Sequence, residues 1–156
     1  GNIGATNALR TGNKLIGYCT LLLDILKAVI PLLYLKFYYL DYIYLGSLCA
    51  FIGHVFPVWL KFKGGKGVAT YLGILFCINY LFGLVFITMW ITIFLIFKYS
   101  SLSSILATLS IPIFHFFYLN NDNYYFFIIL FILIFYTHRQ NVKRLINNTE
   151  FKTKIY

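Results

Sequence analysis

The feature that most constrains this chain is a run of thirty residues, 68–97, that contains no charged side chain. A single soluble core of this size could not shelter such a run together with the other apolar stretches, whereas a lipid bilayer can. The composition agrees, because 61% of the 156 residues are hydrophobic and 11% are charged, compared with about 25% in a typical soluble domain. We therefore expect an all-α, polytopic membrane helix bundle that forms a single domain over residues 1–156.

The length of the uncharged run decides how many membrane segments we expect. As one helix it would be about 45 Å long, whereas the hydrocarbon core of a bilayer is about 30 Å thick. If the run were a single span, five basic loop residues would lie on the inner side of the membrane and seven on the outer side, which shows no bias. Two shorter segments that turn near Asn79 and Gly83 leave only Lys36 outside, Lys27 within the membrane and eleven bases inside, in agreement with the positive-inside rule. The predicted segments are residues 15–35, 42–60, 68–79, 82–97, 102–119 and 123–138.

The net charge of +9 indicates an anionic partner. The basic residues lie between the apolar runs, which favours membrane lipid head groups or an anionic substrate over nucleic acid. The cysteines Cys19, Cys49 and Cys77 lie inside apolar runs without a metal-ligand spacing, so we interpret them as small core residues. The sequence indicates neither a disulfide framework nor a metal site.

The six-segment topology places three polar stretches on the inner face, and the first of them is residues 1–14. Its glycines would let backbone N–H groups approach a ligand. The side chain of Arg10 offers a fork of donors that suits phosphate or carboxylate. Further hydrogen-bonding side chains come from Asn2, Thr6 and Asn7. The alternative interpretation is an ordinary capped loop before a helix.

The second polar stretch is residues 53–70, where Gly64, Gly65, Lys66 and Gly67 precede an apolar helix. Backbone amides and a lysine at a helix N-terminus form a favourable site for an anion. His54 lies near the inner end of the preceding segment and is a further candidate for substrate binding. The alternative is a basic loop that touches only lipid phosphate.

The third polar stretch is residues 137–150, which begins with His138, Arg139 and Asn141. Histidine can exchange a proton near neutral pH, arginine stays charged, and asparagine can orient a neighbour. The alternative, a stop-transfer cluster of positive charge, accounts for the lysines and for Arg144 but not for His138 and Asn141.

Two further polar features lie within the predicted segments. Asp24 and Lys27 are three residues apart on one helical face, which predicts an ion pair, because intramembrane charges are costly unless they are paired. The pair could also support the site indirectly. His115 lies far from the three inner stretches, and we interpret it as a structural histidine.

The patterns GNxGATNxxR, GHxFPVxLxFxGGKGVAT and HRxNxxRL occur in this order. Together they resemble the three cytoplasmic motifs of the bacterial acyl-phosphate:glycerol-3-phosphate acyltransferases. The resemblance implies seven membrane helices, of which the first would precede Gly1, and an active site on the cytoplasmic side of the bacterial inner membrane. It also implies transfer of a fatty acyl group from acyl phosphate to glycerol 3-phosphate, which gives lysophosphatidic acid and phosphate in phospholipid biosynthesis. The resemblance implies no metal and no cofactor, and a soluble enzyme that supplies the acyl phosphate.

This reaction needs a deprotonated hydroxyl, positioning and charge neutralisation, and it needs no enzyme nucleophile. We expect Lys66 and its neighbouring glycines to bind the phosphate of glycerol 3-phosphate. Thr6, Asn7 and Arg10 would then bind the other phosphate and the carbonyl oxygen. His138 is the only candidate for the general base on the inner face besides His54, and an oxygen of the acyl phosphate could serve as the base instead.

A small anion transporter or channel is the alternative function. It would need polar residues along a path across the bilayer. Only Asp24 and Lys27 carry polarity beyond the inner third of the predicted segments, so the acyltransferase is favoured.

Overall fold

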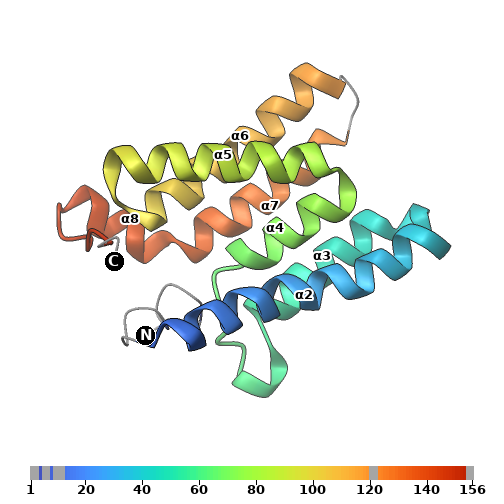
Figure 1. The fold of residues 1–156 in the computed structure, drawn as a ribbon, viewed down its shortest axis with the longest axis horizontal. Coiled ribbons are helices and arrows are strands. Elements are labelled where there is room, and N and C mark those ends of the chain that lie inside the picture. The colour runs from blue at the N-terminus through green and yellow to red at the C-terminus, as the bar shows by residue number, and fades with distance from the viewer. Residues whose placement is uncertain (1–3, 5–7, 9–12, 120–122, 154–156) are drawn as a thin grey trace. The chain divides into compact units, whose positions relative to one another are not determined.

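The structure, a computed structural model, describes residues 4, 8, 13–119 and 123–153, and every regular element within them is a helix (Figure 1). The elements are α2 (Lys14–Tyr38), η1 (Leu40–Tyr42), α3 (Ile43–Val55), η2 (Val58–Leu60), α4 (Val68–Ile78), α5 (Tyr80–Phe97), α6 (Ser100–Leu119), α7 (Tyr124–Thr137) and α8 (Arg139–Ile146). The all-helical fold class is therefore confirmed, and a helix lies at each of the six predicted positions.

The described helices differ in whether each is long enough to cross a bilayer. Four candidate spans meet the requirements of length and apolar character: α2, residues Leu40–Leu60, α5 and α6. Helices α7 and α8 together would form a fifth, although they are bent by 63° at their junction. Helix α4 is apolar but has only 11 residues, about 16 Å at the rise of an α-helix. The count of six spans remains a prediction.

The uncharged run at residues 68–97 is two helices, as predicted. Helix α4 ends at Ile78, and Asn79 is extended with φ −152° and ψ 124°. The side-chain Oδ1 of Asn79 accepts a hydrogen bond from the N–H of Leu81 at 2.9 Å, which satisfies one of the free donors at the start of α5. A Cβ atom on Gly83 would lie 2.7 Å from the ring of Phe76. Glycine is therefore needed where the new helix passes close to the old one.

The chain divides into two compact units, Gly1–Gly83 and Leu84–Tyr156. In the first unit, α2 packs against both α3 and α4. Buried side chains of Leu32, Phe51, Tyr71 and Ile74 form its core. Helix α4 approaches α2 closely because Gly73 has no side chain, since a Cβ atom there would lie 2.9 Å from the carbonyl oxygen of Ile25.

In the second unit, α6 packs along α7. Their contact buries Ile111, Leu130 and Ile134 completely. His115, on α6, is also buried, and its ring centroid lies 5.2 Å from that of Phe127. This packing agrees with the structural role predicted for His115. Many other large apolar side chains on the helices are exposed, as expected for surfaces that face lipid.

Candidate active site

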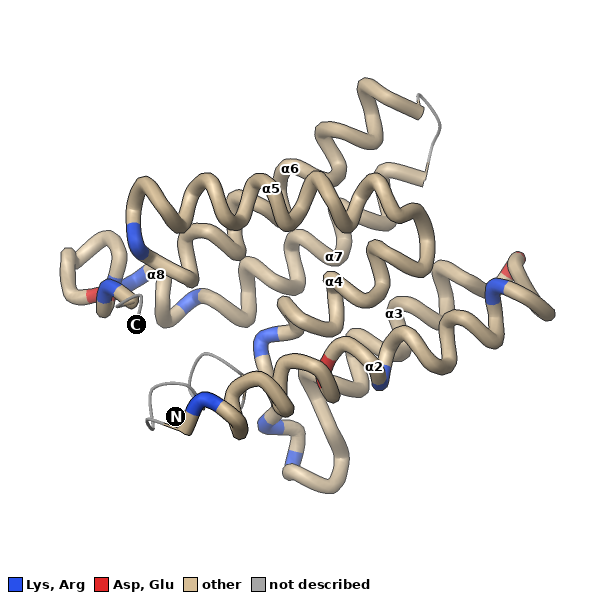
Figure 2. The backbone as a smooth tube through the Cα atoms, in the orientation of Figure 1, with Lys and Arg blue, Asp and Glu red and all other residues tan. Residues whose placement is uncertain are grey.

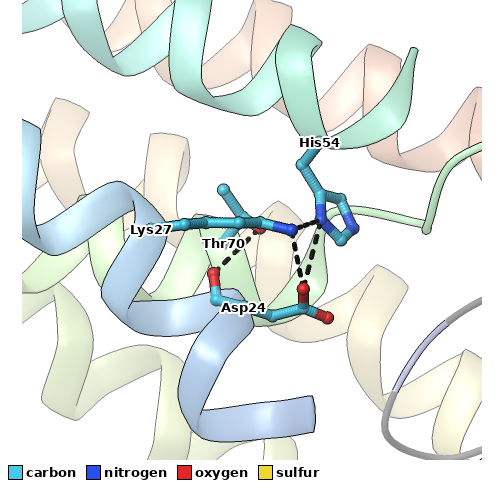
Figure 3. Close-up of polar contacts among 4 residues, drawn as sticks. All are labelled: Asp24, Lys27, His54 and Thr70. Carbon is cyan, nitrogen blue, oxygen red and sulfur yellow. Dashed lines mark hydrogen bonds and ion pairs between the residues drawn. The ribbon is translucent and has the colours of Figure 1, made fainter. Parts of the chain in front are cut away.

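The first unit contains a polar cluster that joins α2 to the ends of α3 and α4 (Figure 3). The Nζ atom of Lys27 lies 2.6 Å from Oδ1 of Asp24, so the predicted ion pair is confirmed. The same Nζ atom contacts Nδ1 of His54, 27 residues along the chain. The hydroxyl of Thr70 donates a hydrogen bond of 3.2 Å to the backbone carbonyl of Asp24. Three helices are thus connected through polar groups around one carboxylate.

The ring of His54 is held between the ammonium and the carboxylate of this cluster. Its Nδ1 atom, which contacts Lys27, also lies 3.5 Å from Oδ1 of Asp24 (Figure 3). The side chain of His54 is only 6% exposed, so these contacts fix the position of the ring against α2. The role of His54 in substrate binding remains a prediction.

The glycine loop is fastened to the end of α3 by two backbone hydrogen bonds. The N–H of Gly64 donates to the carbonyl of Val55 at 3.1 Å, and that of Gly65 to the carbonyl of His54 at 3.3 Å. These two amides close the loop in this structure. A Cβ atom at position 64 would lie 2.1 Å from the carbonyl oxygen of His54. That Gly64 and Gly65 bind phosphate remains a prediction; their geometry gives them a role in positioning the loop.

Lys66 and Gly67 lead directly into α4. Gly67 has φ +85°, a left-handed conformation that favours glycine, and a Cβ atom there would lie 2.2 Å from the ring of Phe51. The first four N–H groups of any helix have no acceptor within the helix. The loop therefore places Lys66 two residues before a helix N-terminus whose amides and dipole both favour an anion.

The second unit contains another polar cluster, centred on Glu150. Its carboxylate accepts hydrogen bonds from Arg144 Nε at 2.6 Å, Asn141 Nδ2 at 2.7 Å and Ser101 Oγ at 2.8 Å. Burial alone would raise the pKa of Glu150. The hydrogen bonds from Asn141, Arg144 and Ser101, together with the charge of Arg144, outweigh it and lower the pKa below the ordinary glutamate value. Glu150 is therefore ionised near neutral pH and fixes the side chain of Asn141.

His138 stands at the bend between α7 and α8, where its side chain is buried. Its Nδ1 atom lies 2.8 Å from the backbone carbonyl of Ile134. A carbonyl can only accept, so Nδ1 carries a proton, and Nε2 is the nitrogen that can act as a base when the ring is neutral. Arg139 donates to the carbonyl of Tyr136 at 3.0 Å, and its guanidinium lies 4.4 Å from the centroid of the Tyr136 ring.

The predicted site residues fall into three groups in the structure. His54, Gly64, Gly65, Lys66 and Gly67 lie together in the first unit, and His138, Arg139 and Asn141 lie together in the second. The predicted ligands of the N-terminal stretch, Asn2, Thr6, Asn7 and Arg10, lie outside the described residues.

Sequence reasoning missed three members of these clusters: Thr70, Ser101 and Glu150. Glu150 is the only glutamate in the chain and lies nine residues after Asn141. A single carboxylate so close to the basic residues 139–144 was a signal that it pairs with one of them. Thr70 gave no such signal, because its bond to Asp24 depends on how α4 packs against α2.

Long apolar helices with many exposed apolar side chains identify the chain as an integral membrane protein. The family model for glycerol-3-phosphate acyltransferase matches residues 1–148. A glycerol-3-phosphate acyltransferase of Pelagibacter ubique is 68% identical over 156 residues, which cover 100% of this chain and 81% of the relative. One of Bartonella henselae is 48% identical over 158 residues, covering 97% of this chain and 75% of the relative.

Two solved structures are similar to this chain. They are crystal structures of PlsY (YgiH), an integral membrane glycerol 3-phosphate acyltransferase. The glycerol 3-phosphate form has a TM-score of 0.91 and 39% identity, and it covers 99% of this chain and 79% of the solved one. The lysophosphatidic acid form has a TM-score of 0.89 and 38% identity, and it covers 99% of this chain and 81% of the solved one. This chain belongs to the glycerol-3-phosphate acyltransferase family, and it is an acyltransferase rather than an anion transporter.

Proposed function

We propose that this enzyme transfers a fatty acyl group from acyl phosphate to glycerol 3-phosphate at the cytoplasmic face of a bacterial inner membrane. The products are 1-acyl-glycerol 3-phosphate and inorganic phosphate. The hydroxyl oxygen of glycerol 3-phosphate forms a bond to the carbonyl carbon, and the bond from that carbon to the bridging oxygen breaks. Phosphate leaves with the bridging oxygen, and the hydroxyl proton passes to a base. A soluble enzyme supplies the acyl phosphate, and no cofactor takes part.

The single observation that carries this proposal is the buried imidazole of His138, which stands next to Arg139 at the start of α8. His138 donates through Nδ1 to the carbonyl of Ile134. In the neutral ring, Nε2 is then the basic nitrogen. A base is what attack by a hydroxyl on a carbonyl requires. An oxygen of the acyl phosphate remains the alternative base.

The anion site is the second part of the proposal. Lys66 and the first amides of α4 would bind the phosphate of glycerol 3-phosphate, because a helix N-terminus and a lysine both favour negative charge. Glu150 would act through Asn141, whose amide it holds at 2.7 Å, and Asn141 would orient a substrate. Arg10, with Thr6 and Asn7, would bind the acyl phosphate.

The test uses the full chain reconstituted in lipid vesicles with glycerol 3-phosphate and one acyl donor at a time. With acyl phosphate, lysophosphatidic acid and inorganic phosphate should appear in equal amounts. Product formed from an acyl thioester, with none from acyl phosphate, would contradict the proposed donor.

The role of the base is tested by His138→Ala. If His138 is the base, turnover should fall by about 10²- to 10⁴-fold, the usual contribution of a general base, while the affinity for glycerol 3-phosphate is retained. Turnover within a few fold of the unmodified enzyme would instead assign the role of base to the acyl phosphate.

A further inference from the structure

The loop between α3 and α4, residues 57–63, carries exposed apolar side chains. Trp59 is 79% exposed, Val58 is 70% exposed and Phe62 is 61% exposed. Lys61 and Lys63 are exposed beside them. The combination of large apolar and cationic side chains on one short loop distinguishes it from helices α5 and α6, whose exposed residues are almost entirely apolar.

The loop is ordered by its own backbone. The N–H groups of Leu60 and Phe62 both donate to the carbonyl of Pro57, at 3.1 and 3.0 Å, and that of Lys61 donates to Val58 at 3.1 Å. Lys61 and Phe62 have φ values of 51° and 61°, left-handed conformations that are unfavourable for residues other than glycine. The fold thus maintains a strained turn that keeps these apolar side chains on the outside.

The position of the loop in the chain limits what can cover these side chains. The candidate span Leu40–Leu60 includes α3 and the first residues of the loop, and apolar helix α4 follows the loop. The loop therefore lies where a span ends, near the level where helices leave the hydrocarbon. Figure 2 shows basic positions on this same loop. Tryptophan favours the membrane interface, and lysines beside it are attracted to anionic lipid phosphates. A protein interface is a poorer match, because lysine is depleted at the core of such interfaces.

We propose that residues 57–63 form an interfacial anchor that binds anionic lipid. Trp59, Val58 and Phe62 insert among the acyl chains just below the head groups, and Lys61 and Lys63 contact the lipid phosphates. The base of the loop continues into Gly64 and Gly65, which are hydrogen-bonded to the end of α3. The anchor therefore sets the depth of Lys66 relative to the head groups, and it does so whichever acyl donor the enzyme uses.

The chain has two tryptophans, Trp59 and Trp90, which makes the depth of the loop measurable. The emission of Trp59 is the difference between the spectra of the unmodified enzyme and of Trp59→Phe, both in vesicles that contain phosphatidylglycerol. Bromine on lipid acyl chains near the head group should reduce this emission by at least about twofold, as expected for an interfacial tryptophan. Aqueous iodide should have little effect. The variant Trp90→Phe, which leaves Trp59 as the only tryptophan, gives an independent second measurement.

Strong quenching by iodide with no effect of brominated lipid would overturn the proposal and indicate a loop in water, available to a protein partner. Strongest quenching by bromine near the methyl ends of the acyl chains would also overturn it, because the loop would then lie in the hydrocarbon core. The lysines are tested by the double variant Lys61→Gln, Lys63→Gln. In the unmodified enzyme, quenching of Trp59 should increase with the fraction of phosphatidylglycerol in the vesicles. In the double variant, quenching should not depend on that fraction. Equal dependence in both would refute the role of the lysines.

Discussion

The substitution Glu150→Gln tests the cluster of the second unit with little change in shape. One carboxylate oxygen accepts from Asn141 and Ser101, and the other accepts from Arg144. In glutamine, one of these oxygens becomes an NH₂ group, which is a donor. Whichever way the amide is turned, a donor faces a donor. The side chain of Glu150 is only 5% exposed, so water has little access to relieve the mismatch.

The expected cost follows from these contacts. A hydrogen bond to a charged group contributes about 1.5–3 kcal/mol, and the substitution loses at least one such bond while the others become neutral. Arg144 is 39% exposed, so water compensates for part of its lost ion pair and this contribution must be discounted. We expect the free energy of unfolding to fall by about 2 kcal/mol. Turnover should fall as well, because Asn141 loses the partner that orients it.

The assay is unfolding of the purified enzyme in detergent, followed by circular dichroism, with turnover measured on the same preparations. Asp41→Asn is the matched control, because it makes the same chemical change in an exposed carboxylate at η1. We expect this control to change the free energy of unfolding by less than about 0.5 kcal/mol. If Glu150→Gln were as stable as the control, the hydrogen bonds described for Glu150 would not be the ones that hold this cluster together.

Three further predictions concern the loop, the pH dependence and the first polar cluster. Gly64→Ala should lower turnover by at least about tenfold, because a Cβ atom there would lie 2.1 Å from the carbonyl of His54. Gly53→Ala is the control and should leave turnover unchanged, because a Cβ atom at position 53 meets nothing within 4 Å. Equal activity of the two variants would refute the tight packing at Gly64. Because the pKa of Glu150 is lowered in the folded chain, its ionised carboxylate contributes stability that is fully present above the ordinary glutamate pKa and is lost as the pH falls through the lowered pKa. The free energy of unfolding, measured against pH, should show this loss in the unmodified enzyme and should lack it in Glu150→Gln. Lys27→Met removes the donor to His54 and should reduce turnover several-fold, with partial recovery in Lys27→Arg; if arginine and methionine behaved alike, the contact would have no part in positioning.

Much of the fold could be predicted from local patterns. The uncharged run exceeded a membrane thickness, so a break near Asn79 was required, and the structure has it there. The ion pair of Asp24 and Lys27 followed from a spacing of three residues on a helix. Both features depend on neighbours in sequence, which is why the sequence alone was sufficient.

The rest depended on packing between distant segments. The contact of Lys27 with His54 spans 27 residues and depends on how α3 packs against α2, which no local pattern specifies. The glycine loop was predicted as a phosphate cradle, but the close approach of Gly64 to the end of α3 is a second reason for glycine there, and it became visible only in three dimensions. The three partners of Glu150 are Ser101 on α6 and Asn141 and Arg144 on α8, so its burial could not be derived from a single helix.

The prediction that the glycine loop and His138 lie on the same side of the membrane is tested most directly by cysteine accessibility. Single cysteines at Lys63 and Lys143, with a third at Tyr39 as the reference for the opposite side, are placed in a full chain that lacks its native cysteines. The proteins are reconstituted in sealed vesicles of one orientation and treated with a membrane-impermeant maleimide from one side at a time. Positions 63 and 143 should react from the same side, and position 39 from the other. Reaction of positions 63 and 143 from opposite sides would contradict a common site for the two phosphorylated substrates.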